Sequence, residues 1–135
     1  MTALRQHIGS VTLLVDDYDT AIAYFTETLG FALTTDEPKG AGDRWVVVTP
    51  SGGGAAIRLS VARDQRQRDA IGSQAGGRVL FVLMTDDVGR DHAAYRARGV
   101  TFLEEPRDEP YGIVAVFADR WGNRWDLIQS RATPD

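Results

Sequence analysis

The sequence has 135 residues, 43% of them hydrophobic and 25% charged, which is typical of one ordinary globular domain with its own core. The absence of cysteine excludes a disulfide scaffold and a thiolate nucleophile, and a net charge of −4 with dispersed arginines argues against nucleic acid as a partner. No apolar run approaches the roughly 20 residues that span a bilayer, and the first residues lack a signal-peptide core, so we expect a cytoplasmic protein without membrane contact.

The first half of the sequence is predicted to form a strand, a helix and three further strands. Aliphatic and β-branched residues favour a strand at residues 8–15, after which Asp16 or Asp17 can cap a helix. Apolar side chains three to four positions apart predict this helix at residues 18–29, and Gly30 ends it. The later strands are predicted at residues 31–35, 44–49 and 56–62, with a polar connection at 37–43 and a hairpin turn at 50–54.

The same order of elements returns in the second half. A polar segment at residues 63–71 predicts a short exposed helix or linker. The elements after it are predicted as a strand at 78–85, a helix at 88–98 and strands at 100–103, 113–118 and 124–129. In both halves an Asp-Asp pair follows the first strand and a glycine ends the helix, which indicates an internal repeat. We therefore predict two βαβββ modules, the first at residues 6–72 with the linker helix and the second at residues 73–130.

The stretch at residues 118–130, ADRWGNRWDLIQS, is predicted to be a turn that opens into the last strand. Asp119, Gly122 and Asn123 are turn formers, because glycine and asparagine tolerate positive φ and aspartate accepts hydrogen bonds from nearby backbone. Side chains alternate along a strand, so Asp126 should lie on the face opposite Trp125 and Leu127.

The duplicated βαβββ pattern, with VDDYDTAIAYFTETLGF after the first strand and DRWGNRWDLI near the end, resembles the vicinal oxygen chelate superfamily. This superfamily comprises glyoxalases, bleomycin-resistance proteins and extradiol dioxygenases. The resemblance covers about residues 8–129. It implies an α+β fold of two modules whose mixed sheets curl around a single cavity, and a homodimer.

The resemblance also implies where a metal would bind, since metal-using members place ligands on the first and fourth strands of each module. Those positions correspond to Ser10 and Leu80 on the first strands, and to Arg58 and Asp126 on the fourth. Only Asp126 is a good ligand, because leucine offers no donor and a guanidinium repels a divalent cation. We therefore expect neither a bound metal nor another cofactor; a divalent metal would require a different alignment of the ligand positions.

Several residues are candidates for contact with a ligand instead. Arg58 and Asp126 occupy corresponding positions and are predicted to form an ion pair that orients the ligand. Aromatic and apolar side chains would supply the walls, namely Trp45, Tyr111, Trp125, Leu80 and Met84, with Ser10 beside them. Residues 104–112 are predicted to be a polar connection, and the overlapping stretch 106–114 around Tyr111 is predicted to form a lid.

Two functions of different classes follow from these residues. In the first, the protein binds a small organic molecule without a metal, as the bleomycin-resistance branch does. In the second, it is a lyase, isomerase or oxygenase that uses Asp126 as an acid or base, or a divergent metal site. The scaffold hosts many chemistries, so the sequence leaves both functions open.

Overall fold

Each half of the chain folds around one four-stranded mixed sheet in a computed structural model that describes residues 3–131. The chain divides into two compact units, unit 1 up to Arg68 and unit 2 from Asp69, and each is described by itself. The boundary falls inside the short helix α2 (Gln65–Ala70). None of the helices between residues 3 and 131 has the length and apolar character that crossing a membrane demands.

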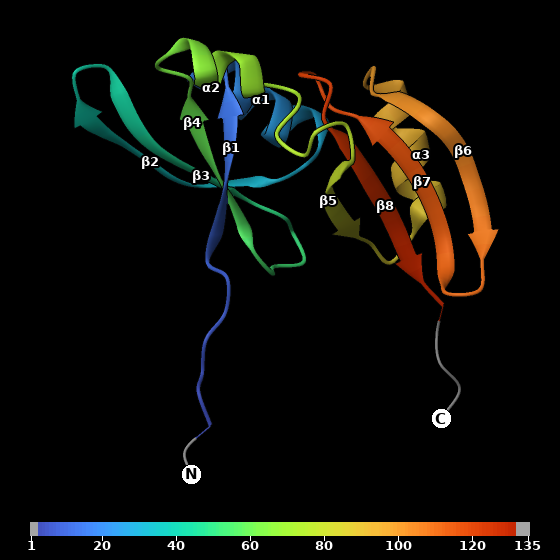
Figure 1. The fold of residues 1–135 in the computed structure, drawn as a ribbon. Helices are drawn as coiled ribbons and strands as arrows, with labels where there is room; N and C mark the ends of the chain where they lie inside the picture. Colours follow the sequence, from blue (N-terminus) through green and yellow to red (C-terminus); the bar gives the residue numbers. More distant parts are fainter. Residues whose placement is uncertain (1–2, 132–135) are drawn as a thin grey trace. The chain divides into compact units, whose positions relative to one another are not determined.

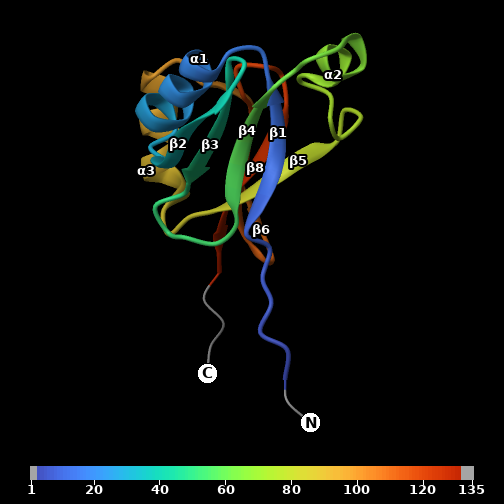
Figure 2. The ribbon, with the colours of Figure 1, turned by 90° about the vertical axis from the view of Figure 1, so that its left-hand side faces the viewer.

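Unit 1 contains a helical segment and four strands. The elements are β1 (Ser10–Val15), α1 (Tyr18–Ala23), η1 (Tyr24–Thr28), β2 (Ala32–Gly40), β3 (Asp43–Thr49) and β4 (Ala56–Val61). The strand order is β1-β4-β3-β2, with β1 parallel to β4 and the other pairs antiparallel (Figure 2). Helix α1 continues directly into η1, where the hydrogen bonds widen to π-type, so together they cover nearly all of the predicted helix.

Unit 2 repeats this arrangement. Its elements are β5 (Val79–Met84), α3 (Val88–Ala97), β6 (Thr101–Glu109), β7 (Gly112–Ala118) and β8 (Arg124–Ser130). The order is β5-β8-β7-β6, again with the first and fourth strands parallel, and α3 packs against β6, β7 and β8 (Figure 1). The predicted α+β class and the two βαβββ modules are confirmed. The single cavity expected from the resemblance stays a prediction.

The second aspartate of each Asp-Asp pair caps the helix that follows it, which confirms the cap expected from Asp16 or Asp17 in the first half. The carboxylate of Asp17 accepts a hydrogen bond from the Thr20 backbone N–H at 2.8 Å, and that of Asp87 accepts one from the Arg90 N–H at 3.0 Å. Each carboxylate thereby satisfies an N–H group that the first turn of a helix leaves free.

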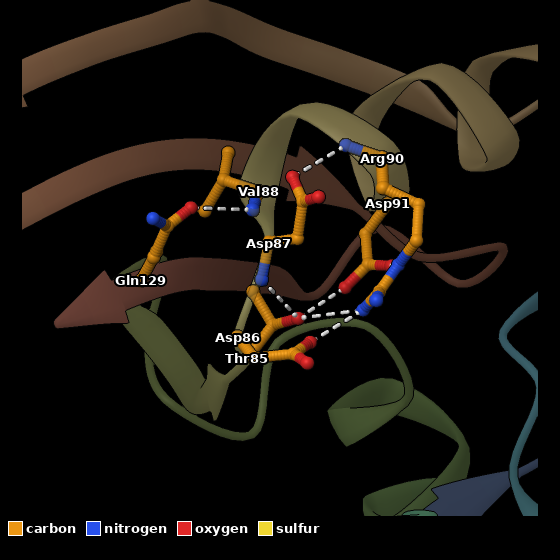
Figure 3. A network of polar contacts seen from close by, with 7 residues as sticks. All are labelled: Thr85, Asp86, Asp87, Val88, Arg90, Asp91 and Gln129. Carbon is orange, nitrogen blue, oxygen red and sulfur yellow. Dashed lines mark hydrogen bonds and ion pairs between the residues drawn. The ribbon is translucent and has the colours of Figure 1, made fainter.

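A wider polar network surrounds the cap of α3 (Figure 3). The Arg90 guanidinium binds Asp86 at 2.6 Å and Asp91 at 2.9 Å, and the Thr85 hydroxyl donates to Asp91. The side-chain oxygen of Gln129 accepts from the Val88 N–H at 2.9 Å, which connects the start of α3 to β8. The Asp-Asp sequence therefore fixes the helix to the end of the preceding strand.

The sequence prediction was wrong about two connections, at residues 37–43 and 104–112. Strand β2 continues to Gly40 and β6 to Glu109, so each segment is mostly strand and ends in a two-residue turn. Both strands lie at sheet edges, where the proline within each removes no interior hydrogen bond. In the first turn Ala41 and Gly42 both have positive φ, 55° and 79°, as in the tight hairpins that suit strand twist. The predicted lid is therefore a β-hairpin.

The turn between β7 and β8 is organised by the buried carboxylate of Asp119, which is 5% exposed. It accepts hydrogen bonds from the backbone N–H groups of Trp121 and Asn123 at 3.0 and 2.9 Å. It also accepts from the Asn123 side chain at 3.1 Å and from the Trp125 indole N–H at 2.9 Å. A single side chain thus fixes both the turn and the first core residue of β8.

Replacing Asp119 with alanine should lower the free energy of unfolding by about 2 to 4 kcal/mol, because it leaves several buried donors without an acceptor. Chemical denaturation monitored by circular dichroism measures this loss. Asp119→Asn, which keeps one acceptor oxygen, should lose less. Asp108→Ala is the control, since it removes only an exposed ion pair with Arg131, and a loss equal to that of Asp119→Ala would contradict the assigned role.

Candidate functional site

Arg58, Trp45 and Asp126 lie on the sheet faces that α1 and α3 do not cover, which we call the helix-free faces. In unit 1, Ile57 and Leu59 of β4 are buried beneath the helix, so Arg58 between them faces the opposite way. Across the sheet it pairs with Thr12 of β1 and Val47 of β3. This row of side chains is polar at β1 and apolar at β3.

Arg58 stacks on an aromatic ring within this face. Its guanidinium carbon lies 3.9 Å from the ring centroid of Trp45, a residue of β3 that is 37% exposed. The Lys39 ammonium lies 5.4 Å from the same centroid, and Glu37 is the β2 partner of Trp45. A guanidinium held against the face of an indole gains a favourable cation–π interaction and loses part of its freedom to move.

The buried Nε of Arg58 has no hydrogen-bond partner among the residues that the structure describes. An unmet buried donor costs about 1–3 kcal/mol, and more where the group is charged. The same guanidinium forms no ion pair with a residue of unit 1. Arg58 is therefore a half-buried cation without a carboxylate partner in its own unit.

On the helix-free face of unit 2 the central residue is Asp126. Its neighbours along the strand, Trp125 and Leu127, are buried in the core, which confirms the predicted alternation. Asp126 pairs across the sheet with Val82 of β5 and Val116 of β7, and Val116 in turn pairs with Glu104 of β6. The carboxylate is thus flanked by two apolar side chains.

This environment changes the acidity of Asp126. Burial raises the pKa of its carboxyl above the ordinary value, Arg107 opposes the rise, and Glu104 adds to it. The Arg107 guanidinium also binds Glu104 at 2.9 Å and Glu109 at 2.5 Å. A carboxyl that holds its proton more firmly than usual can donate a hydrogen bond or a proton to a ligand.

The other predicted site residues are placed differently. Ser10 and Leu80 lie two positions before Thr12 and Val82, which are the residues directly beside Arg58 and Asp126. Met84 is 54% exposed on the face of Asp126, and Tyr111 is 55% exposed in the β6–β7 turn.

Trp125 was predicted to line the cavity, yet it is 1% exposed and donates its indole N–H to Asp119. Its ring stacks against Phe117 with centroids 5.4 Å apart, within the core of unit 2. We therefore assign Trp125 to packing, and any contact with a ligand stays a prediction. The Arg58–Asp126 ion pair also stays a prediction, because it would join one residue of each unit.

The residues at the four implied metal positions do not fit a divalent cation. Arg58 carries a fixed positive charge stacked on Trp45, and Leu80 has no donor atom, which leaves a serine hydroxyl and one carboxylate. Elsewhere in residues 3–131, histidine, aspartate and glutamate side chains form no group of three or more that could hold a metal ion.

Sequence reasoning missed three residues that define these faces: Thr12, Val116 and Lys39. Strand alternation alone places Thr12 and Val82 on the correct faces, but their pairing with the fourth strands depends on register.

Unit 1 also has a hollow of about 720 Å³ beside the β2–β3 turn, lined largely by charged side chains and glycines. None of the predicted site residues lines it.

These sheets and faces define a known class of fold. Residues 7–127 match the family described as the Glyoxalase/Bleomycin resistance protein/Dioxygenase superfamily. The match covers most of the chain, and the chain belongs to this family. The resemblance inferred from the two sequence motifs is therefore confirmed.

Several individual proteins are similar to this chain in sequence or structure. The chain is 44% identical to an uncharacterized protein of Shewanella frigidimarina (strain NCIMB 400), over 93% of this chain and 95% of that protein. Its structure is similar to the crystal structure of UcmS2, with 32% identity, a TM-score of 0.81 and coverage of 94% and 100% of the two chains. It is also similar to TnmS3, an antibiotic binding protein from Streptomyces sp. CB03234, with 30% identity, a TM-score of 0.77 and coverage of 96% and 100%.

Asp126→Asn should stabilise the protein at neutral pH and have no effect at acid pH. The pKa of Asp126 in the folded state is higher than the ordinary value. The stability of the protein therefore falls as the pH rises from the ordinary to the raised pKa, and it stays lower at higher pH. Denaturant titrations of both proteins across pH measure the difference. Asp108→Asn, at an exposed position, is the control, and a parent protein that gains stability on Asp126 ionisation would contradict the assignment.

Proposed function

We propose that this protein binds a small organic molecule on the helix-free face of unit 1, through Arg58 and Trp45 and without a metal. The observation that carries the proposal is the half-buried Arg58 guanidinium, stacked 3.9 Å from the Trp45 ring and with its buried Nε lacking an acceptor. A ligand that accepts hydrogen bonds from this group supplies what the folded chain does not.

The chemistry of this face suits a small molecule. Trp45 and Val47 offer apolar surface, while Arg58 and Thr12 offer polar groups at defined places on the sheet. Small-molecule sites combine apolar contact, which gives affinity, with a few fixed polar groups, which set orientation. Strands carry all four side chains, so the backbone holds them in a fixed arrangement.

The comparison with TnmS3 supports the same class of function. That protein is described as antibiotic binding, and it shares 30% of its residues with this chain and covers it nearly end to end. We propose that the present chain likewise sequesters an organic ligand, in the cytoplasm and as a homodimer. The chemistry of the four implied metal positions favours binding without a metal, since two of them carry arginine and leucine.

A second candidate function is catalysis by Asp126. The observation that favours it is the carboxyl between Val82 and Val116, whose desolvation raises its pKa. A general acid needs a proton held near the working pH and a position within hydrogen-bond reach of the substrate. In this alternative Asp126 donates or accepts the proton in a lyase, isomerase or oxygenase reaction.

A screen of aromatic fragments by NMR tests the binding proposal. Compounds that bind should shift the indole N–H signal of Trp45, and Trp45→Leu and Arg58→Ala should each weaken their binding at least about tenfold without unfolding the protein. Arg66→Gln, on the exposed helix α2, is the matched control and should bind normally. Equal affinity in the parent protein and both site variants would reject the site.

A further inference from the structure

Arg58 differs from the paired arginines of the chain in the partners of its guanidinium. Arg44 binds Asp36 at 2.7 Å and Asp19 at 2.8 Å, and Arg107 is held by two glutamates. Arg58, in contrast, binds no carboxylate of unit 1, although its side chain is half-buried. Buried charges are ordinarily paired, so Arg58 needs a partner from outside unit 1, and an anionic ligand on this face would supply one.

The charged groups around Trp45 leave an excess of positive charge on this face. The Lys39 ammonium lies 5.4 Å from the ring and shares its charge with Asp43, whose carboxylate is 3.8 Å away. Asp43 is itself bound by the Tyr18 hydroxyl at 2.6 Å and by Arg63. Glu37, the exposed β2 partner of Trp45, is the acidic residue of this row.

The planar shape of the Arg58 guanidinium limits which chemical groups can serve as its partner. A carboxylate can accept two parallel hydrogen bonds from the two Nη groups of an arginine, and such charge-assisted bonds are stronger than bonds between neutral groups. The guanidinium carbon lies 3.9 Å from the Trp45 ring centroid, and this contact limits the positions that the donors can take. A neutral carbonyl could accept one bond but would leave the charge uncompensated.

We infer that the ligand of this face is an organic anion, a small molecule with a carboxylate or an equivalent acidic group that binds Arg58 and an apolar part that contacts Trp45 and Val47. This inference rests on the proposed binding function and specifies its ligand class. Arg58 supplies the charge, Trp45 positions the guanidinium, and Lys39 adds a second, more distant cation.

A pair of probes of equal shape tests the inference. Isothermal titration calorimetry with 2-naphthoate and with the neutral 2-naphthamide should show at least about tenfold tighter binding of the anion. Raising the salt concentration should weaken the naphthoate complex and leave the amide complex unchanged, since salt screens charge. Arg58→Gln should remove the preference for naphthoate, and Arg58→Lys should retain part of it, because lysine keeps the charge but loses the planar fork.

The outcomes separate this inference from the function on which it rests. Binding of both probes with equal affinity would overturn the anionic ligand class while supporting a small-molecule site. Binding of neither probe would overturn both proposals. A preference for naphthoate that survives unchanged in Arg58→Gln would place the anion elsewhere and reject the role of Arg58, and circular dichroism of each variant establishes that it is folded.

Discussion

The alternation of side chains along the fourth strand of each module governs what both helix-free faces can do. In β4 the buried residues Ile57 and Leu59 force Arg58 to the other side of the sheet, and in β8 Trp125 and Leu127 do the same for Asp126. A slip of one residue would turn each charged side chain into the core and each core residue outward. Correct register is therefore a condition for the candidate site as well as for stability.

Hydrogen bonds to Asp119 help to fix the register of β8. Its buried carboxylate binds the Trp125 indole and the backbone of the preceding turn at the same time. Because the indole then stacks on Phe117, the start of β8 is held both by hydrogen bonds and by packing. Asp126 follows directly, and its position is set by a residue that touches no ligand in our account.

Much of the fold follows from local sequence signals, because both modules carry complete ones. Asp17 and Asp87 cap helices, and the alternation around Asp126 places it opposite Trp125. The long hairpins were missed because their polar composition, with glycines in the first, is typical of connections. Only the sheet order reveals that β2 and β6 lie at an edge, where a proline is tolerated.

The candidate site was less accessible to sequence reasoning than the fold. Arg58 and Asp126 could be selected by their positions, but the stacking of Arg58 on Trp45 joins two strands and depends on their register. Trp125 was selected as a wall residue because aromatic character alone does not separate core from ligand contact. Side-chain type selected Trp45 and Trp125 alike, and only their burial in the structure separates the two.

The central claim is that the protein binds an organic molecule through its own side chains and without a metal. Native mass spectrometry of freshly purified protein, under gentle and then denaturing conditions, tests it most directly. The account predicts a metal-free species that carries a small organic molecule, which denaturation releases. One divalent metal ion per chain, retained through dialysis, would contradict the account and restore a chelating site.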